Sequence, residues 1–375
     1  MTNDLMSRRK KIWNVTWRIV VCAILLGWIF HAIFVNEAKL VAPDKGIEWQ
    51  QLSRLEQWET AWRIGPPELW HTLSSVQTIP FIVSILLVGL TVLIGVVRWR
   101  MVMEVQGLHL SFVRTTEISF VAHFFNSFLL GSTGGDLMKA FYAARETHHL
   151  KTEAVTTVFV DRLIGLWSML FFATIMMLPN LELLAKYDRF RAAAFLILGM
   201  FVGCSGLLIL AFWGGVSKMW PTARHYMRKI PKAELLERSL DACRQFGPHK
   251  SFLWKSFVLS MALNAIVVLQ VIALSKGLGL ALSPTALFMI VPIIICISAL
   301  PITPSGLGVR ENLFVLMLAA PEIYLAATEV APMTSRLSLS LLMFAGSLFW
   351  SIVGGVVYLC LREKQHLKEI AQAEA

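Results

Sequence analysis

Charged residues are scarce in this sequence of 375 residues: Asp, Glu, Lys and Arg make up 15% of it, whereas 56% is hydrophobic. A soluble domain needs more charge than this to cover its surface. The shortage therefore excludes an ordinary soluble protein and indicates a protein whose solvent is a lipid bilayer. The 13 Trp and 23 Phe agree, because aromatic rings concentrate at membrane interfaces and on helices that face lipid.

Paired cysteines and recognisable catalytic clusters are also missing. The five cysteines are scattered, with no Cys-x-x-Cys pair: Cys22, Cys204, Cys243, Cys296 and Cys360. This pattern indicates neither a disulfide framework nor a zinc site. No acidic pair suited to a metal and no combination of nucleophile and base stands out, so we expect no catalytic residue, no metal and no cofactor.

The net charge of +10 is spread over short stretches beside apolar segments and does not form one basic face. Nucleic acid is therefore not an expected partner. Lys and Arg in short loops instead indicate which loops face the cytoplasm.

The sequence contains several long apolar runs. A membrane span needs about 20 mostly apolar residues. Six segments meet this requirement: 16–35, 78–97, 153–178, 192–214, 255–277 and 336–360. Two further stretches, 111–145 and 283–328, are interrupted by Gly-rich breaks, which predict broken hairpins in place of single helices. The expected fold is an all-α polytopic membrane protein of about eight helices, including two re-entrant or broken hairpins that form an inverted repeat.

Charge counting predicts one membrane domain over 1–362 with both termini in the cytoplasm. The segment 36–77 has more acidic than basic residues, which suits the outer side, and it is amphipathic through Leu52, Leu55 and Trp58. The basic loop 215–252 and the polar tail 363–375 suit the cytoplasm. Six crossings then require the first hairpin to enter from the cytoplasm and the second from outside.

The two breaks resemble each other. The first is Gly131-Ser132-Thr133-Gly134-Gly135-Asp136 and the second is Pro304-Ser305-Gly306-Leu307-Gly308. Each is followed by a basic residue, Lys139 or Arg310. A second basic residue, Arg162 or Arg336, follows at a similar distance in each unit. Two similar units of opposite insertion are typical of an inverted-topology repeat, whose broken helices usually meet at the substrate site.

The breaks carry groups that suit an anion. Backbone freed from helical hydrogen bonds is tolerated at membrane depth only beside protein or a water-filled cavity, and its N–H groups can hold a phosphate. The predicted substrate-binding residues are Asn126, Ser132, Thr133, Gly134, Gly135, Asp136, Asp161, Arg162, Thr303, Ser305, Gly306, Gly308, Arg310, Glu311 and Arg336. The plainer alternative is that the glycines only allow close helix packing.

Ionisable residues in apolar helices are costly and often functional. Asp161 and Arg162 point about 100° apart on a helix, so we expect each to pair with another partner. Arg310 is expected to meet Asp136 or Asp161, and Glu311 to meet Arg162 or Arg336. The alternative is that these ion pairs only hold neighbouring helices together. Single polar residues such as His123 and Asn264 more often bond a neighbouring helix than bind a substrate.

The sequence resembles the membrane region of lysylphosphatidylglycerol synthase/flippase and its stand-alone bacterial relatives. The resemblance rests on residues 125–136, 161–166 and 300–311, and it extends over roughly 78–362. It implies about eight helices with re-entrant elements in the bacterial cytoplasmic (inner) membrane, and a role in handling phospholipids or lipid-linked molecules. The sequence departs from the full synthase because no aminoacyl-transferase domain follows Leu361, so lysyl transfer is not expected.

The resulting hypothesis is a flippase-like protein that binds and translocates a phospholipid or lipid-linked anionic substrate. Membrane lipids are its expected partners, and a homo-oligomer is compatible with the sequence. Two alternatives stay open: an accessory subunit of another enzyme, and a membrane transferase that acts on a lipid carrier with Asp136 or Asp161 as base. Ion transport has less support, because the acidic residues are few and are not paired along one helix.

Overall fold

The computed structural model describes residues 41–127, 133–146, 151–213, 244–300, 306–325, 330–331 and 333–360, with scattered positions between 20 and 39. These residues are 86% helical and form no strand. Five helices are long and apolar enough to cross a membrane: 78–105, 151–186, 188–209, 250–277 and 335–360. They confirm five of the six predicted spans. Most of the first span (16–35), most of the 215–252 loop and the 363–375 tail lie outside the described residues.

The core of the protein is two runs of four helices, which match in length except at the third helix. The first run is α3 (Thr78–Val105), α4 (Phe112–Asn126), α5 (Thr133–Glu146) and α6 (Lys151–Met177). The second is α12 (Lys250–Gly277), α13 (Pro284–Ser298), α14 (Val309–Met317) and α15 (Met333–Cys360). The helices contain 28, 15, 14 and 27 residues in the first run and 28, 15, 9 and 28 in the second.

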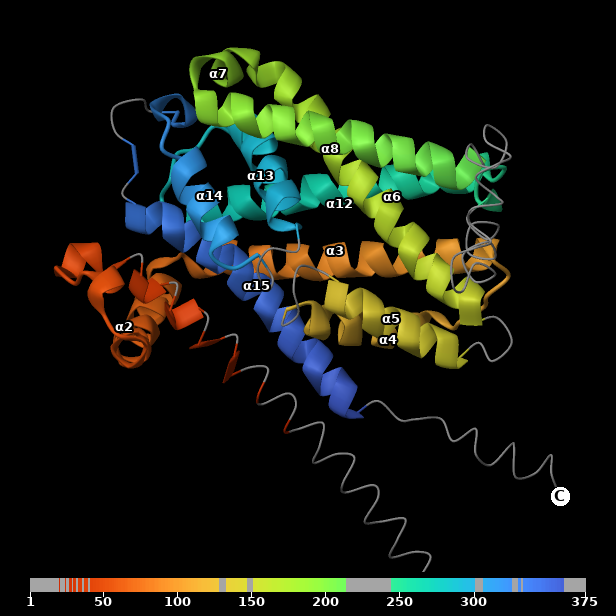
Figure 1. Cartoon of the computed structure of the whole chain (residues 1–375), viewed down its shortest axis with the longest axis horizontal. Coiled ribbons are helices and arrows are strands. Elements are labelled where there is room, and N and C mark those ends of the chain that lie inside the picture. The colour runs from red at the N-terminus through yellow and green to blue at the C-terminus, as the bar shows by residue number, and fades with distance from the viewer. Residues whose placement is uncertain are drawn as a thin grey trace, which may run out of the picture.

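The two runs are related by inversion. The long helices α3 and α12 lie side by side (Figure 1) and run antiparallel: Gln77, before α3, donates its N–H to Gly277 at the end of α12, and Arg98 reaches back to Ser260. The short helices exchange partners, since α4 packs on α15 and α13 packs on α6. Matching helices that point in opposite directions are the arrangement expected of an inverted repeat.

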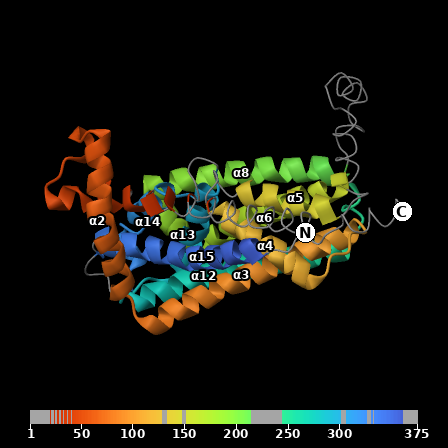
Figure 2. The same ribbon diagram turned by 90° about the horizontal axis from the view of Figure 1, so that it is seen from below.

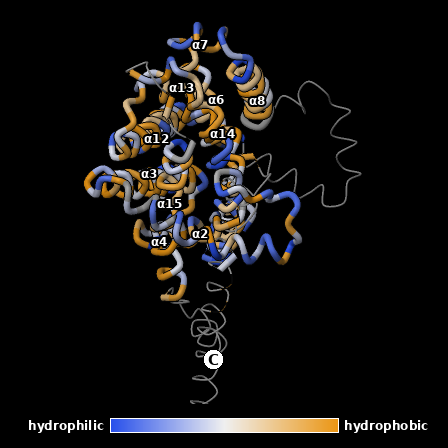
Figure 3. Tube along the Cα trace, turned by 90° about the vertical axis from the view of Figure 1, so that its left-hand side faces the viewer, coloured by the Kyte–Doolittle hydropathy of each residue, from blue (hydrophilic) through white to orange (hydrophobic). Residues whose placement is uncertain are grey.

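Other elements surround these two runs. Between them lie η3 (Leu178–Asn180), α7 (Leu181–Lys186) and α8 (Asp188–Trp213). Before α3 come η1 (Pro43–Lys45), η2 (Trp49–Gln51) and α2 (Arg54–Ser75), and η4 (Pro321–Ile323) follows α14. Figure 3 shows strongly apolar colouring on α8 and α12, with hydrophilic stretches around α2 and α7. Large apolar side chains of α8, such as Phe195 and Val202, are exposed, as contact with lipid requires.

The helix α2 crosses one end of the bundle. Figure 2 shows it running across the direction of α3 and α15. A capping box between Ser53 and Glu56 begins the helix, and it exposes Leu55, Trp58 and Trp70. Exposed aromatic rings on a helix in this position favour the predicted interfacial location. The second amphipathic segment predicted from the sequence, around Leu236 and Leu240, lies outside the described residues.

Connections between the helices gather at the two ends of the bundle. The helix α2, the 177–188 connection and the 277–284 connection lie at one end, called here the α2 end (Figure 1). The 105–112 connection, the last residue of α5 and the first residue of α6 lie at the opposite end. Each hairpin therefore begins and ends at the same end of the bundle, and the two hairpins start from opposite ends.

Glycine determines how each break is built. In the second hairpin, Gly306 and Gly308 have φ of 72° and 82°, a left-handed conformation that side chains other than glycine rarely adopt. In the first hairpin, a Cβ on Gly135 would lie 2.2 Å from the carbonyl oxygen of Ala122. Gly135 thus allows α5 to pack directly on α4. This is the close helix packing that the sequence analysis gave as the plainer role of the glycines.

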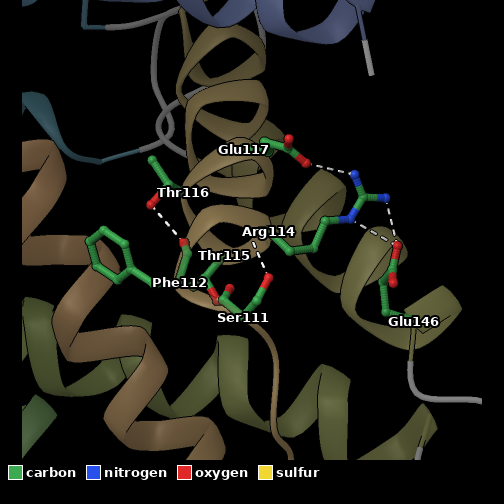
Figure 4. A network of polar contacts seen from close by, with 7 residues as sticks. All are labelled: Ser111, Phe112, Arg114, Thr115, Thr116, Glu117 and Glu146. Atoms are coloured by element: carbon green, nitrogen blue, oxygen red, sulfur yellow. Dashed lines mark hydrogen bonds and ion pairs between the residues drawn. The ribbon is translucent and has the colours of Figure 1, made fainter. Parts of the chain in front are cut away.

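Each hairpin is closed at its base by different contacts. In the first, Arg114 of α4 donates from Nε to Glu146 at the end of α5 (2.9 Å) and from a terminal nitrogen to Glu117 (2.9 Å), as Figure 4 shows. In the second, Ser283 donates its N–H to Ile323 (2.7 Å) and Leu325 donates to Ala281 (2.8 Å). These contacts keep the two ends of each hairpin together.

We expect the Arg114–Glu146 pair to stabilise the first hairpin measurably. The side chains are only 13% and 17% exposed, so solvent screens them weakly. A double-mutant cycle with Arg114→Ala and Glu146→Ala should give a coupling energy on the order of 1 kcal/mol in thermal unfolding. The exposed Arg100–Glu104 pair, at 42% and 47%, is the matched control and should give almost none. Equal coupling in the two cycles would contradict this assignment.

Candidate functional site

A cavity of about 440 Å³ lies where the two hairpin breaks meet the long helices. The short helices α4 and α13 contribute their last residues, Asn126 and Ser298, to its wall. The helices α5 and α14 contribute residues from their first turns, Asp136 and Arg310. The remaining wall comes from α3, α6, α12 and α15. Every helix of the inverted repeat therefore reaches this one cavity.

A buried group of charges forms one side of the cavity. Arg98 of α3 donates from Nε to Asp161 Oδ1 of α6 at 2.8 Å, and from a terminal nitrogen to Ser260 Oγ of α12 at 2.9 Å. Lys139 Nζ of α5 lies 3.7 Å from Asp161 Oδ2. The side chains of Arg98, Lys139 and Asp161 are 11%, 14% and 9% exposed. One carboxylate therefore faces two buried cations.

Small and aromatic residues position this group. A Cβ on Gly165 would lie 2.9 Å from a guanidinium nitrogen of Arg98, so glycine provides the space that the guanidinium occupies. The ammonium of Lys139 lies 4.6 Å from the ring centre of the fully buried Trp99. The face of an aromatic ring attracts a cation, and this attraction partly offsets the free energy that the cation loses when it leaves water.

A second ion pair lies at the accessible side of the cavity. Arg162 Nε of α6 is 3.5 Å from Asp136 Oδ2 of α5, and the two side chains are 39% and 28% exposed. Leu137 and Phe159, their neighbours on the same helices, are 68% and 56% exposed. Exposed apolar residues on a membrane helix face lipid, so this pair lies between the cavity and the lipid-facing surface of α5 and α6.

Arg310 supplies a fourth cation from the second hairpin. Its guanidinium pairs with Glu311, donates to Ser340 Oγ at 3.2 Å and lies over the ring of Phe344 at 4.8 Å. Glu311 is fully buried and also accepts the N–H of Gly308 at 2.6 Å, which closes the first turn of α14. Glu311 therefore fixes Arg310 and the backbone of the break together.

The cavity wall carries an excess of positive charge. It contains four basic side chains, Arg98, Lys139, Arg162 and Arg310, and two acidic ones, Asp136 and Asp161. Glu311 lies behind Arg310 and reduces the excess without removing it. An anionic group in the cavity would be electrostatically favoured over a cationic one.

Five of the predicted substrate-binding residues line this cavity: Asn126, Asp136, Asp161, Arg162 and Arg310. Gly135 lies beside it and donates its N–H to Asn126 Oδ1 at 2.7 Å. Gly134, Gly306, Gly308 and Glu311 support the breaks without lining the cavity. Arg336 lies apart and donates to the carbonyl of Val315 near the end of α14. Ser132, Thr303, Ser305 and the side chain of Thr133 lie outside the described residues.

The charge pairs follow the sequence-based expectations only in part. Asp161 and Arg162 each pair with another residue, Arg98 and Asp136, as their angular separation predicts. The partners expected for Arg310 and Glu311 were wrong, because these two residues pair with each other. The reason is local: Glu311 folds back to cap Gly308 and so comes within reach of the long Arg310 side chain.

Arg98, Lys139 and Ser260 are cavity residues that the sequence analysis did not select. Arg98 follows the predicted span 78–97, where it looks like a charge at the membrane surface. The helix α3 continues to Val105, which places Arg98 inside it. A charge within an apolar helix is the signal that could have identified Arg98. His123, in contrast, bonds the carbonyl of Ser347 on α15 at 3.2 Å, consistent with the contact to a neighbouring helix that was expected.

The sequence of this chain matches one known protein family over most of its length. Residues 57–324 match the family described as the lysylphosphatidylglycerol synthase TM region. The chain belongs to this family. The match covers α2 to η4 and therefore all of the first hairpin and most of the second. No curated protein matches the chain.

As a member of the lysylphosphatidylglycerol synthase TM family, the protein is a multi-pass membrane protein related to lipid modification or transport. Among the residues that the structure describes, no group of three or more His, Cys, Asp or Glu side chains could hold a metal ion. The Arg, Lys, Asp, Ser and Asn side chains of the cavity can form ion pairs and hydrogen bonds with a ligand.

Proposed function

We propose that this protein binds the anionic headgroup of a phospholipid or lipid-linked substrate in the cavity and moves it across the bacterial cytoplasmic membrane. The observation that carries the proposal is the cavity itself, because four cations and two acids meet there at the breaks of two inverted hairpins. Burying uncompensated cations in a membrane protein is costly, and an anionic ligand would offset that cost.

The size of the cavity favours a headgroup over a whole lipid. A volume of about 440 Å³ has room for a phosphate and a small polar group, but acyl chains must stay in the bilayer. The headgroup then needs a lateral way in. The half-exposed Arg162–Asp136 pair, beside the lipid-facing Leu137 and Phe159, supplies charged groups at such an opening.

The inverted repeat supplies a means of translocation. Two similar halves around one site can each open in turn, so that the site faces one side of the membrane and then the other. The first hairpin would begin and end on the cytoplasmic side and the second outside, with α2 on the outer surface. Both termini would then lie in the cytoplasm, as the positive charges predict.

The test is headgroup translocation by the purified protein in proteoliposomes. Vesicles should contain a labelled anionic phospholipid, a labelled zwitterionic one or a labelled neutral diacylglycerol. We expect the protein to speed up movement of the anionic headgroup over empty vesicles, by a factor at least about tenfold larger than for the zwitterionic or the neutral lipid. Movement equal to that in empty vesicles for every anionic lipid would contradict the proposal. Chemical change of the headgroup during the assay would favour a lipid-modifying enzyme instead.

A further inference from the structure

Glu37 is a buried acid outside the cavity. It lies just beyond the predicted first span, is 2% exposed, and its Oε1 has no hydrogen-bond partner among the described residues. Apolar residues surround this part of the chain: Ile33, Phe34 and Ala38 pack with Ala61 and Ile64 of α2, with Leu307 before α14, and with Phe344 and Leu348 of α15. An ionised carboxylate is strongly disfavoured in such a place unless a cation pairs with it.

The surrounding charges do not provide that cation. The acids that act on Glu37 are Glu311 of α14 and Glu68 of α2. The nearby bases pair with these same acids, since Arg310 pairs with Glu311 and Lys45 pairs with Glu68.

The other titratable groups on the packed elements are engaged elsewhere or exposed. On Glu37's own segment, His31 accepts the indole N–H of Trp62 and Lys39 is exposed. Arg63 of α2 is also exposed, and Arg336 of α15 bonds the carbonyl of Val315. Burial first, and then Glu311 and Glu68, raise the pKa of Glu37 to about 8.

We propose that Glu37 is a proton-binding residue that couples the protonation of the N-terminal segment to the charge state of the cavity. This inference rests on the proposed function, because it names the proton as a second ligand of the same transport cycle. The ligand is taken up and released as H⁺ between the carboxyl group and water. The connection to the cavity runs through Glu311, which acts on Glu37 and holds the cavity residue Arg310.

The two protonation states of Glu37 differ in the charge that lies near the Arg310–Glu311 pair. With Glu37 neutral, no second negative charge lies beside the Arg310–Glu311 pair, and the N-terminal segment packs against Leu307 and α15. With Glu37 ionised, its carboxylate repels that of Glu311 and has no cation of its own in an apolar place. That repulsion acts on Glu311, which holds Arg310, and so reaches the cation that faces the cavity.

The protonation step can be measured without any transport assay. Infrared titration of the full-length protein in nanodiscs should show a carboxylic-acid band that disappears between about pH 7 and about pH 9. The band should be missing from Glu37→Gln, an isostere of the neutral acid, and unchanged in Glu48→Gln, an exposed acid of the same external segment. An identical titration in wild type and Glu37→Gln would overturn the proton site. Glu37→Leu serves the same purpose if Glu37→Gln does not fold.

Stability should follow the same titration. The folded protein keeps the proton up to about pH 8, whereas an unfolded chain loses it near the ordinary value of 4.5. The folded state thus binds more protons, so stability should fall as pH rises from about 5 to about 8 and then level off. Thermal unfolding of Glu37→Gln should lack this component. An equal pH dependence in Glu37→Gln and wild type would also argue against the site.

Coupling to the cavity is tested by the pH dependence of translocation. Wild-type headgroup translocation should change at least about threefold between about pH 7 and about pH 9, and Glu37→Gln should remove this dependence. A proton titration of Glu37 without any effect on the rate would overturn the coupling. Absence of translocation at every pH would contradict the proposed function, while the infrared titration would still decide whether Glu37 binds the proton.

Discussion

Replacing Asp161 by Asn should destabilise the protein more than any other single change of charge in the described part of the chain. The substitution keeps the size of the side chain but leaves Arg98 and Lys139 buried without their shared carboxylate. Breaking a buried pair typically costs about 3 to 5 kcal/mol. The midpoint of thermal unfolding in detergent should fall by on the order of 10 °C.

Two further variants make this expectation specific. Asp188→Asn is the same chemical change at the start of α8, where the side chain is 89% exposed, and it should have almost no effect. Adding Arg98→Gln to Asp161→Asn should recover part of the lost stability, because it removes one of the two unpaired cations. Equal midpoints for Asp161→Asn and Asp188→Asn would show that the buried charges are not held as described.

The second large effect is expected from Gly135→Val. The added Cβ would meet the carbonyl oxygen of Ala122 at 2.2 Å and the side chain of Asn126 at 2.6 Å. The nearest of these atoms is backbone, so α5 must move away from α4 and the bond from Gly135 to Asn126 must break. Asp136 and Lys139 would move with α5, and headgroup translocation should fall by about tenfold or more.

Gly199→Val on α8 is the matched control. Nothing lies within 4 Å of a Cβ at this position, so the same substitution meets open space. Translocation and thermal stability should stay close to wild type. A Gly135→Val protein as active as Gly199→Val would mean that the close contact of α4 and α5 does not shape the cavity.

The fold follows well from the sequence because its main signals are long apolar runs. Five predicted spans are confirmed, and both broken stretches are pairs of short packed helices. Helix ends are less well determined, because a helix can continue past its apolar core. The helix α3 does so beyond residue 97, and this extension turns Arg98 from a surface charge into a buried one.

The site was harder to predict because ion pairs depend on how helices approach each other. Asp161 and Arg162 are adjacent in sequence, yet they meet residues of α3 and α5, respectively. Lys139 was noted only as the basic residue after the first break, and its position over Trp99 depends on the packing of both α3 and α5 on α6. In the sequence, Glu37 is one of several acidic residues in the segment 36–77, and nothing marks it as buried. Its burial depends on α2 and on residues far away in the sequence, among them Leu307 and Phe344.

The central claim, that the cavity between the hairpins holds an anionic headgroup, is tested most directly by cross-linking. A phospholipid with a photoreactive group in its headgroup should be incorporated with the protein into nanodiscs, and the labelled peptides identified by mass spectrometry. We expect labelling on residues 123–139 and 295–310, competed by unlabelled anionic lipid but not by diacylglycerol. Labelling confined to outer surfaces such as α2 and α8, without such competition, would contradict the account.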